Sequence, residues 1–369
     1  MNLSNPSTLL PGLAPGSSVL ILRMRSLGDI VLLTPALAAL HTWRPDLHIT
    51  VAVEPEFSAL LEGNPAVRDV FLVRGLPQTA REIRRRRFAI VFNQHGGPTS
   101  AFLTALSNAP IRVCWERRQF SFFYNVLVPS PAHFFGPRRI HTVEQRMTQF
   151  YWTGLEQGPI PATCVFPQED ALNVVAKKLA ERGLSAGQPY AVIHPGASYF
   201  TKRLAAEKFS ATAQWLQEAR GIIPVVSVGP DEGGLALEMR ERLGPRAILF
   251  EPGALDLRQV IALISRARLF VGNDSGPAHL AAATGRPAVV IFGSSDSTAW
   301  RPWQTAHRIV QNDFPCNPCP GDRCYAFDEP RCILSVAVEQ VKEACAALLD
   351  ATAVAPVLPA ADLTTRKES

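Results

Sequence analysis

The sequence lacks the segments that would place a protein across a membrane or direct its export. It has no apolar run of about 18 or more residues, the length that a spanning helix needs. Residues 1–16 are polar and rich in proline and glycine, without the basic-then-apolar order of a secretory signal. We therefore expect a cytoplasmic protein. A net charge of only +5 is too small to indicate a nucleic-acid partner.

Three common catalytic signatures are also missing. There is no G-x-S-x-G elbow with a Ser-His-Asp order, no G-x-x-x-x-G followed by a Walker lysine, and no G-x-G-x-x-G after the first apolar strand. These motifs would supply an activated serine, a phosphate cradle or a dinucleotide turn. Their absence argues against a serine hydrolase, a P-loop enzyme and a dehydrogenase.

What the sequence does contain is 47% hydrophobic residues in a chain of 369, enough for two domains with separate cores. Short apolar runs alternate with helical patterns, which predicts parallel strands covered by helices on both faces. The expected strands are Val19–Arg23, Ile49–Val53, Asp69–Val73 and Ala89–Asn93, then Tyr190–His194, Ile222–Val228, Ala247–Phe250, Leu269–Gly272 and Ala288–Phe292. The fold class is α/β, with two Rossmann-like doubly wound domains that face a central cleft.

Prolines mark the boundary between the two domains. Pro159, Pro161 and Pro167 precede a helix expected over Glu169–Arg182, so we place a hinge near Cys164–Gln168. The predicted segments are a flexible N-terminus over 1–16, domains over 17–165 and 166–350, and a disordered tail over 351–369.

The first candidate site is Asp274–His279 (DSGPAH), between a predicted strand and a predicted helix. Ser275 suits an N-cap, and Gly276 lets the backbone approach a ligand. The free N–H groups at such a helix start suit a diphosphate. His279 lies one turn into the helix and is expected to face the same side. The alternative is an ordinary capped helix.

The second candidate is His194–Ser198 (HPGAS), directly after a predicted strand and followed by Lys202 and Arg203. Small residues at a strand end permit close approach of a ligand. Lys202 supplies a point charge and Arg203 a forked donor for phosphate oxygens. The alternative is that Lys202 is a surface lysine.

The third candidate is Asp29, at the first strand-turn-helix junction. A carboxylate at a helix start has a lowered pKa and is ionised near neutral pH, ready to accept a proton. An equally good interpretation is that Asp29 only caps the helix that follows.

Four of the seven cysteines crowd into the stretch Cys316, Cys319, Cys324 and Cys332. Four thiols in such a span could hold a structural Zn²⁺. The spacing departs from the common paired C-x2-C arrangement, so simple reduced thiols remain the alternative.

Taken together, these motifs resemble glycosyltransferase family 9, the ADP-heptose:lipopolysaccharide heptosyltransferases. The likeness lies, in the family's order, in Arg23–Ile30 (RMRSLGDI) with Thr34–Leu37 (TPAL), His141–Gln145 (HTVEQ), His194–Gly196 with Lys202–Arg203, and Asp274–His279. The set is far more specific than any one of its members.

The resemblance implies a GT-B fold, with an acceptor-binding domain over 17–165 and a nucleotide-sugar-binding domain over 166–350. It implies inverting transfer of a heptose, or a related sugar, from ADP-heptose to an acceptor of the lipopolysaccharide-core type. Asp29 matches the family's proposed general base. The residues that match donor-binding positions are His194, Gly196, Ser198, Lys202, Glu232, Asp274, Ser275, Gly276 and His279. One base and a set of positive groups are enough for such a transfer, so no cofactor is required.

Two questions of function stay open at this point. The alternative to transfer is a nucleotide-sugar-binding or epimerase-like GT-B protein without transfer activity. The expected acceptor is a lipid-linked glycan, with peripheral contact to the inner face of the cytoplasmic membrane. Phe120–Phe123 and Phe134–Phe135, near basic pairs, indicate either such a surface or a buried aromatic cluster.

Overall fold

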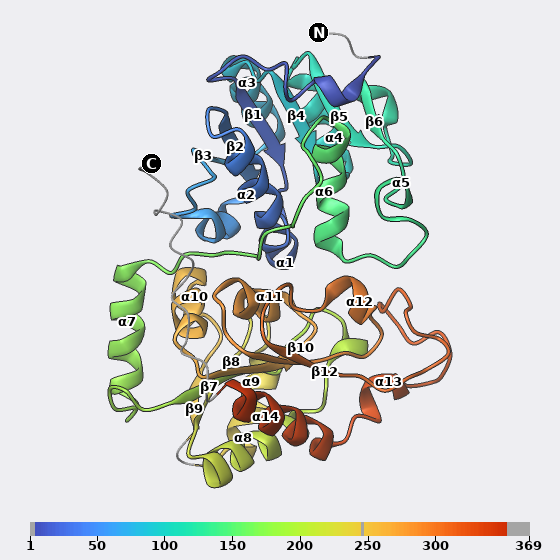
Figure 1. Ribbon diagram of the computed structural model, residues 1–369. Coiled ribbons are helices and arrows are strands. Elements are labelled where there is room, and N and C mark those ends of the chain that lie inside the picture. The colour runs from blue at the N-terminus through green and yellow to red at the C-terminus, as the bar shows by residue number, and fades with distance from the viewer. Residues whose placement is uncertain (1–3, 245–246, 353–369) are drawn as a thin grey trace. The chain divides into compact units, whose positions relative to one another are not determined.

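The chain, described here by a computed structural model, folds into two compact units, Met1–Thr163 and Cys164–Ser369. The structure describes residues 4–244 and 247–352. Each unit contains one six-stranded sheet whose strand pairs are all parallel, with helices packed on both faces (Figure 1). This arrangement confirms the α/β architecture expected from the alternation of apolar and helical patterns.

The sheet of the first unit has the strand order β3-β2-β1-β4-β5-β6. Its strands are β1 (Ser18–Leu22), β2 (His48–Val53), β3 (Asp69–Leu72), β4 (Ile90–Asn93), β5 (Ile111–Trp115) and β6 (Val126–Val128). The helices are η1 (Pro6–Thr8), α1 (Leu27–Val31), α2 (Thr34–Trp43), η2 (Pro55–Leu61), α3 (Leu76–Arg86), α4 (Pro98–Leu106), η3 (Ser121–Phe123), α5 (Ala132–Phe135) and α6 (Thr142–Trp152).

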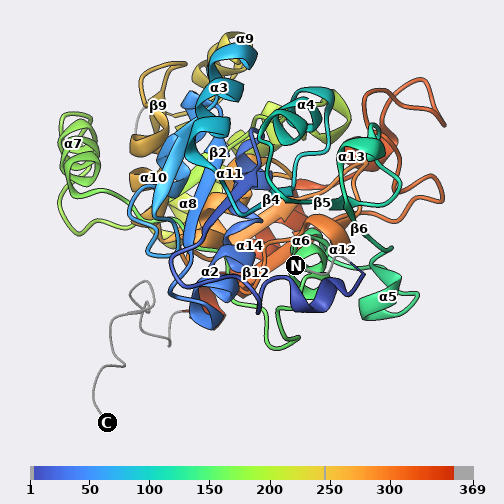
Figure 2. The ribbon, with the colours of Figure 1, turned by 90° about the horizontal axis from the view of Figure 1, so that it is seen from above.

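Helices cover both faces of this sheet. The view from above shows α3 and α4 on one face and α2 and α6 on the other (Figure 2). The central strands are therefore buried on both sides, which explains their near-continuous apolar sequence.

The N-terminal segment differs from its prediction. Residues 1–16 were expected to be flexible, but Leu9, Leu10 and Leu13 are each at most 3% exposed. The backbone N–H of Leu10 donates to the carbonyl of Thr153, and Arg44 donates to the carbonyls of Leu10 and Leu13. The flexible-segment prediction is therefore wrong for this part of the chain, because three leucines supply apolar surface that the unit buries. Of the predicted tail, residues 351 and 352 end helix α14 and the rest lies outside the described residues.

The sheet of the second unit has the order β12-β11-β10-β7-β8-β9. Its strands are β7 (Tyr190–His194), β8 (Ile223–Ser227), β9 (Ile248–Phe250), β10 (Leu269–Asn273), β11 (Ala288–Ile291) and β12 (His307–Val310). The helices are α7 (Glu169–Ala180), η4 (Phe200–Lys202), α8 (Ala206–Arg220), α9 (Gly233–Arg242), α10 (Leu257–Ser265), α11 (Gly276–Ala283), α12 (Ser297–Trp300), α13 (Arg331–Leu334) and α14 (Val338–Thr352). Helices α8, α9 and α14 pack on one face, and α10 and α11 on the other (Figure 1).

In both units the strand ends carry the candidate residues. Asp29 follows β1, His194 ends β7, and Asp274 follows β10. Because all pairs are parallel, the carboxyl ends within one sheet meet at one edge, where ligands bind in open α/β sheets. None of the described helices is long and apolar enough to cross a membrane.

Candidate functional site

Asp29 lies inside the short helix α1 rather than at its cap. The N-cap of α1 is Ser26, and Asp29 occupies the first turn. The helix-cap interpretation of Asp29 is therefore wrong as stated. The carboxylate instead accepts bonds from side chains, including the hydroxyl of Ser26, whose Oγ lies 3.1 Å from Oδ2.

Two arginines bind the Asp29 carboxylate, one at each oxygen. Nη2 of Arg146 lies 2.7 Å from Oδ1, and Nη2 of Arg23 contacts Oδ2. Both arginine side chains are more than nine-tenths buried, while that of Asp29 retains 18% of its surface. The carboxylate is thus fixed in direction but still reaches solvent.

The charges of this group set its titration. Burial alone would raise the pKa of Asp29, but Arg23 and Arg146 hold it below its usual value. Burial, and then repulsion from Arg23, lowers the pKa of Arg146 to about 9. Asp29 therefore stays ionised through neutral pH, and its charge stabilises two buried cations that would otherwise repel each other.

Glutamine side chains and a shared carbonyl hold the two arginines in place. Nη1 of Arg23 donates to the carbonyl of Gln94 at 2.7 Å, and Nη1 of Arg146 donates to the same carbonyl at 3.0 Å. The Gln94 amide donates in turn to Gln149 and to the carbonyl of Arg146. The strand end at Gln94 and helix α6 are thereby joined to the carboxylate.

Sequence reasoning missed Arg146. The segment His141–Gln145 was noted only as part of a resemblance, although Arg146 is the next residue. A capping box positions this helix: the His141 ring accepts from the N–H of Val143, and the Glu144 carboxylate accepts from the N–H of His141. Its position directly after the recognised segment is the only hint that the sequence offers, and the contact with Asp29 appears only in the fold.

His95 lies beside this cluster, in the loop after β4. Burial, and then the nearby charges of Arg23 and Arg25, lowers the pKa of His95 to about 4, so its ring is neutral at pH 7. An open hollow at this edge is lined by residues that follow four strands, among them Arg25, Glu54, Arg74, His95 and Thr99.

Four buried polar atoms around Asp29 have no hydrogen-bond partner among the described residues. They are Nε of Arg23, Nε of Arg146, Oε1 of Gln94 and Nδ1 of His95. Buried polar atoms in folded proteins are almost always paired with protein groups or water. Buried water would complete the hydrogen bonds of these atoms, which are themselves shielded from bulk solvent.

In the second unit, His194 and Glu232 lie close to the turn at Gly196. His194 is buried, and its Nδ1 lies 2.8 Å from the carbonyl of Ser227. Burial lowers the pKa of His194, against the opposing effect of the Glu232 charge. The Glu232 carboxylate accepts from the N–H of Gly229 at 2.7 Å and fills the space where a Cβ of residue 196 would lie.

Lys202 forms an ion pair with Asp274 and is only partly exposed, so it is not a free surface lysine. Nζ of Lys202 lies 2.8 Å from Oδ2 of Asp274, whose side chain is only 5% exposed. The adjacent Asn273 fixes both strand ends: its amide donates to the carbonyl of Pro195, and its Oδ1 accepts from the N–H of Leu204. The two sequence motifs, His194–Ser198 and Asp274–His279, therefore meet at one edge.

Helix α11 begins at Gly276 with Pro277 in its first turn, as the motif predicts. Ser275 is its N-cap by position, but the Ser275 hydroxyl bonds the carbonyl of Asn273 and caps no helical N–H. His279 is buried beside Trp300 rather than exposed at the helix start. Ser198 is exposed on the loop after β7.

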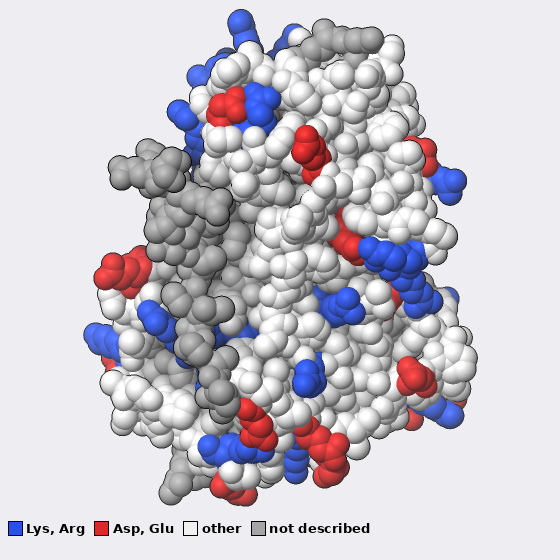
Figure 3. Space-filling view, viewed as in Figure 1, with Lys and Arg blue, Asp and Glu red and all other residues white. Residues whose placement is uncertain are grey.

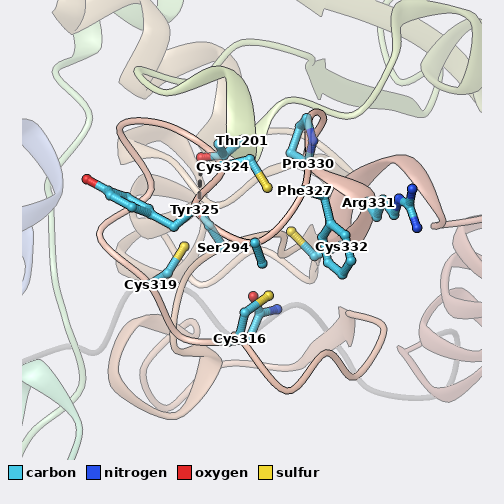
Figure 4. A pocket seen from close by; sticks show the side chains of 12 residues that line it. Thr201, Ser294, Cys316, Cys319, Cys324, Tyr325, Phe327, Pro330, Arg331 and Cys332 are labelled. Carbon is cyan, nitrogen blue, oxygen red and sulfur yellow. Dashed lines mark hydrogen bonds between the residues drawn. The ribbon is translucent and has the colours of Figure 1, made fainter.

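The four cysteines line one small pocket with Thr201 and Ser294 (Figure 4). Cys332 lies on α13, and the other three lie on the loop before it. None of the four forms a disulfide. Burial raises the pKa of Cys332, with smaller contributions from the other three thiols. Over residues 4–244 and 247–352, no group of three or more Cys, His, Asp or Glu is placed to hold a metal ion.

Comparison with known proteins agrees with this geometry. Residues 77–326 match the family described as glycosyltransferase family 9 (heptosyltransferase). The chain belongs to glycosyltransferase family 9. Lipopolysaccharide heptosyltransferase 3 of Escherichia coli is 28% identical over 295 residues, which cover 76% of this chain and 84% of that protein.

Solved structures of family 9 proteins share the fold. A glycosyl transferase family 9 protein from Veillonella parvula superposes with a TM-score of 0.81 at 20% identity, covering 92% of this chain and 99% of that one. ADP-heptose lps heptosyltransferase II of E. coli gives a TM-score of 0.77 at 19% identity, covering 91% and 100%. The family 9 chain is thus a glycosyltransferase with a GT-B fold, as the resemblance implied.

Proposed function

We propose that this family 9 glycosyltransferase moves a heptose from ADP-heptose to an acceptor of the lipopolysaccharide-core type, with inversion at the anomeric carbon. The names of its curated relatives support the sugar and the acceptor class. The two residue clusters described above support the two halves of the chemistry.

On the acceptor side, Asp29 is the general base. It accepts the proton of the acceptor hydroxyl as that oxygen forms its bond to the anomeric carbon. Arg23 and Arg146 fix the direction of the carboxylate, which itself retains some exposed surface. The hollow lined by Arg25, Glu54 and His95 has the mixed polarity that a glycan requires.

On the donor side, Lys202 and the first N–H groups of α11 bind the diphosphate. The bond between the anomeric carbon and the phosphate oxygen breaks, and the electron pair leaves with ADP. Lysine and a helix N-terminus stabilise the charge that develops there. Lys202 would exchange its partner Asp274 for a phosphate oxygen. Glu232, which lies beside Gly196, would accept hydrogen bonds from hydroxyls of the nucleotide ribose.

The observation that carries this proposal is the buried Arg23–Asp29–Arg146 group, an ionised carboxylate fixed at a strand end of a family 9 chain. The test is to titrate the purified protein with a panel of nucleotide sugars and an acceptor glycan, and to identify the products. Transfer from ADP-heptose with inverted configuration supports the proposal. Binding without transfer, or epimerisation of the donor, would replace it with the alternative function.

Transfer by this mechanism requires no cofactor, because the base and the cationic groups come from the chain itself. Cys316, Cys319, Cys324 and Cys332 would instead hold a structural zinc ion. Four thiolates are the usual ligands of structural zinc and the four cysteines line one pocket, but they would have to rearrange to bind an ion, because the described residues hold no preformed metal group. Elemental analysis of anaerobically purified protein tests it.

The acceptor class also suggests where the protein works. We place it in the cytoplasm, in peripheral contact with the inner face of the membrane that carries a lipid-linked acceptor. Phe122 is 75% exposed beside the packed rings of Phe120 and Phe123, and Arg117 and Arg118 are exposed nearby. Elsewhere, basic and acidic side chains are interspersed on the face shown in Figure 3. Loss of binding to anionic vesicles in Phe122→Ser would support this contact, and unchanged binding would remove it.

A further inference from the structure

A second open hollow of the first unit lies at the amino edge of its sheet, opposite the edge that carries Asp29. It has a volume of about 750 Å³ and lies between the end of α3 and the loop from α4 to β5. Its lining residues are Arg81, Arg84, Arg85, Arg87, Phe88, Ala89, Ser107, Asn108 and Pro110. Four of them are arginines and none is acidic, so we call this strongly cationic site the arginine hollow.

The four arginines of the hollow have no acidic partners. Over residues 4–244 and 247–352, none of them forms an ion pair, and all four side chains are exposed. Arg86 differs, because it pairs with Asp69 and Glu82 and does not line the hollow. A guanidinium without a carboxylate partner remains available to a phosphate group, which it binds through two parallel hydrogen bonds.

Folding alone does not explain these side chains. A helix C-terminus favours cations, which accounts for the arginines in the last turn of α3. Arg87, however, ends the helix with a φ of 52°, in the left-handed region where glycine or asparagine is usual. The chain thus has a long cationic side chain at a position where a smaller residue would suit the backbone better.

Exposed apolar side chains continue from the hollow along α4. Leu106, at the end of α4, and Phe102, one turn earlier, are each more than 40% exposed. The ring of Phe102 packs against Phe120 and Phe123, beside the exposed Phe122. Cationic groups next to exposed apolar groups suit a bilayer surface, because its headgroups present phosphates directly above hydrocarbon.

Hydrogen bonds join the wall of the arginine hollow to the aromatic segment. The Asn125 amide donates to the carbonyl of Pro110 at 2.7 Å. Arg112 donates from Nε to the carbonyl of Phe123 at 2.8 Å and from Nη1 to the carbonyl of Ala109 at 2.7 Å. The cationic and apolar parts therefore form one preorganised surface rather than two separate patches.

Helices α3 and α4, which pack side by side, connect this surface to the acceptor side (Figure 2). Leu76 and Pro98, at the starts of the two helices, line the hollow beside His95, whereas the helix ends lead to the arginine hollow. Helix α4 has 9 residues, which span about 14 Å. A lipid headgroup at the arginines would thus lie roughly one helix length from the acceptor hollow, a distance that a short glycan can span.

We propose that the arginine hollow binds phosphate groups of anionic lipid headgroups, with Phe102 and Leu106 in contact with the bilayer beside it. The inference rests on the peripheral membrane contact proposed above, and it assigns that contact to the ends of α3 and α4. The arginines take no part in bond making or breaking. They hold the enzyme on the surface that carries its lipid-linked acceptor.

The first experiment measures binding to vesicles by co-sedimentation. Vesicles of phosphatidylcholine with phosphatidylglycerol are compared with vesicles of phosphatidylcholine alone. The double variant Arg84→Gln/Arg85→Gln should bind the anionic vesicles about 25-fold more weakly than the wild type, since each basic residue near such a surface contributes about 5-fold. The control Lys177→Gln/Arg308→Gln removes two exposed positive charges from the second unit and should bind as the wild type does.

Arg87→Gly separates lipid binding from folding. The melting temperature should change little, because glycine readily adopts the left-handed conformation of residue 87. Binding to the anionic vesicles should still weaken by about 5-fold. A lower melting temperature with normal vesicle binding would make Arg87 a structural residue and contradict the proposal.

Three results would overturn the proposal. The first is equal binding of Arg84→Gln/Arg85→Gln and its control to anionic vesicles. The second is binding of inorganic pyrophosphate through the same arginines with no preference for anionic vesicles, which would make the hollow a site for a soluble phosphate compound. The third is slower transfer to a soluble acceptor glycan in Arg84→Gln/Arg85→Gln alone, which would place the arginines in glycan binding.

The same assays distinguish this proposal from the proposed function. If the wild type transfers no heptose to the soluble acceptor, the proposed function fails, and vesicle binding still decides the role of the arginine hollow. If the wild type transfers heptose but does not prefer anionic vesicles, the membrane contact and the arginine site fail while the transfer activity stands.

Discussion

The Nη2 atom of Arg146 lies 2.7 Å from Oδ1 of Asp29, although the two residues are 117 positions apart in the sequence. The contact joins α6 to the first strand-turn-helix junction and leaves the carboxylate ionised. A base with a lowered pKa is a weaker proton acceptor, but it is charged and correctly oriented in every molecule at neutral pH. The two arginines thus fix the orientation of the Asp29 carboxylate and reduce its basicity.

Asp29→Asn should abolish most of the transfer activity. The substitution keeps size and hydrogen-bonding shape but removes proton acceptance, which typically costs about 10²- to 10⁴-fold in rate. The Kd of ADP should change little, because Asp29 belongs to the acceptor side. Asp46→Asn, which alters a part-buried ion pair with Arg44 outside the Asp29 cluster, is the matched control and should keep normal turnover. Near-normal turnover in Asp29→Asn with a lower melting temperature would make Asp29 a structural residue only.

Arg146→Met should move the acid limb of the kcat/KM profile to higher pH. Arg146 and Arg23 lower the pKa of Asp29 in the native enzyme. Without Arg146 that pKa rises, so the base becomes protonated, and activity is lost, at a higher pH than in the wild type. Breaking a buried ion pair should also destabilise the fold by about 3 kcal/mol. Arg146→Lys should recover part of the lost stability and should shift the acid limb less than Arg146→Met does. An unchanged acid limb would show that Asp29 is not the group that limits activity.

Lys202→Ala should raise the donor KM and also lower kcat, because the leaving group gains charge in the transition state. Lys202→Arg should recover part of the activity, since it keeps a positive charge near Asp274. The control is Lys177→Ala, on the exposed face of α7. Steady-state kinetics with ADP-heptose give both constants, and an unchanged kcat/KM would exclude Lys202 from the site.

The central strands of both sheets were predicted from the sequence more completely than the edge strands. The central strands were identified because burial on both faces makes them continuous apolar runs. The edge strands β6 and β12, and β5 beside β6, were not predicted. Val126–Val128 has only three residues, and His307–Val310 (HRIV) has only two apolar residues, so neither gives a distinct signal. The apolar segment around Asp29 forms two helices, α1 and α2, which are separated at Leu32 and Leu33.

The candidate residues were found where a motif follows a strand, whereas the contacts between distant residues, and Arg146 itself, were not predicted. Asp29, Lys202 and Asp274 each lie in a short recognisable segment. The side chains that bind them, Arg146 for Asp29 and Asp274 for Lys202, are separated from them by 117 and 72 positions. No local pattern encodes such a contact. The fold has to be known before the electrostatics can be derived.

His95→Gln should make stability less sensitive to acid. In the folded protein the pKa of His95 is lowered to about 4, from the ordinary value of 6.5. The unfolded chain therefore binds more protons between these values, so the wild type loses stability as pH falls from 6.5 towards 4. Glutamine cannot take up that proton, and the melting temperature of the variant should fall less across this window. Above pH 7 the melting temperatures of the wild type and the variant should change with pH in the same way. Parallel curves at pH 4.5 as well would show that His95 titrates normally.

Gly196→Ala tests Glu232 without removing it. A Cβ at residue 196 would lie 2.0 to 2.4 Å from the carboxylate atoms of Glu232, so that side chain must rotate away and lose its bond from the N–H of Gly229. The clash is with the end of a flexible side chain rather than with backbone. The melting temperature should therefore change little, because an alanine also stabilises by about 0.4–1 kcal/mol through the unfolded state.

Nucleotide binding, unlike the melting temperature, should change in Gly196→Ala. If Glu232 binds a donor hydroxyl, Gly196→Ala should weaken ADP or ADP-heptose binding about as much as Glu232→Ala, and the double variant should be no worse than either, since both remove one interaction. Gly233→Ala is the matched control, because a Cβ there meets no atom within 4 Å. Calorimetry gives the affinities of all four proteins. If Gly196→Ala binds the nucleotide as tightly as the control does, Glu232 has no part in donor binding, and its role is to fix the turn after β8.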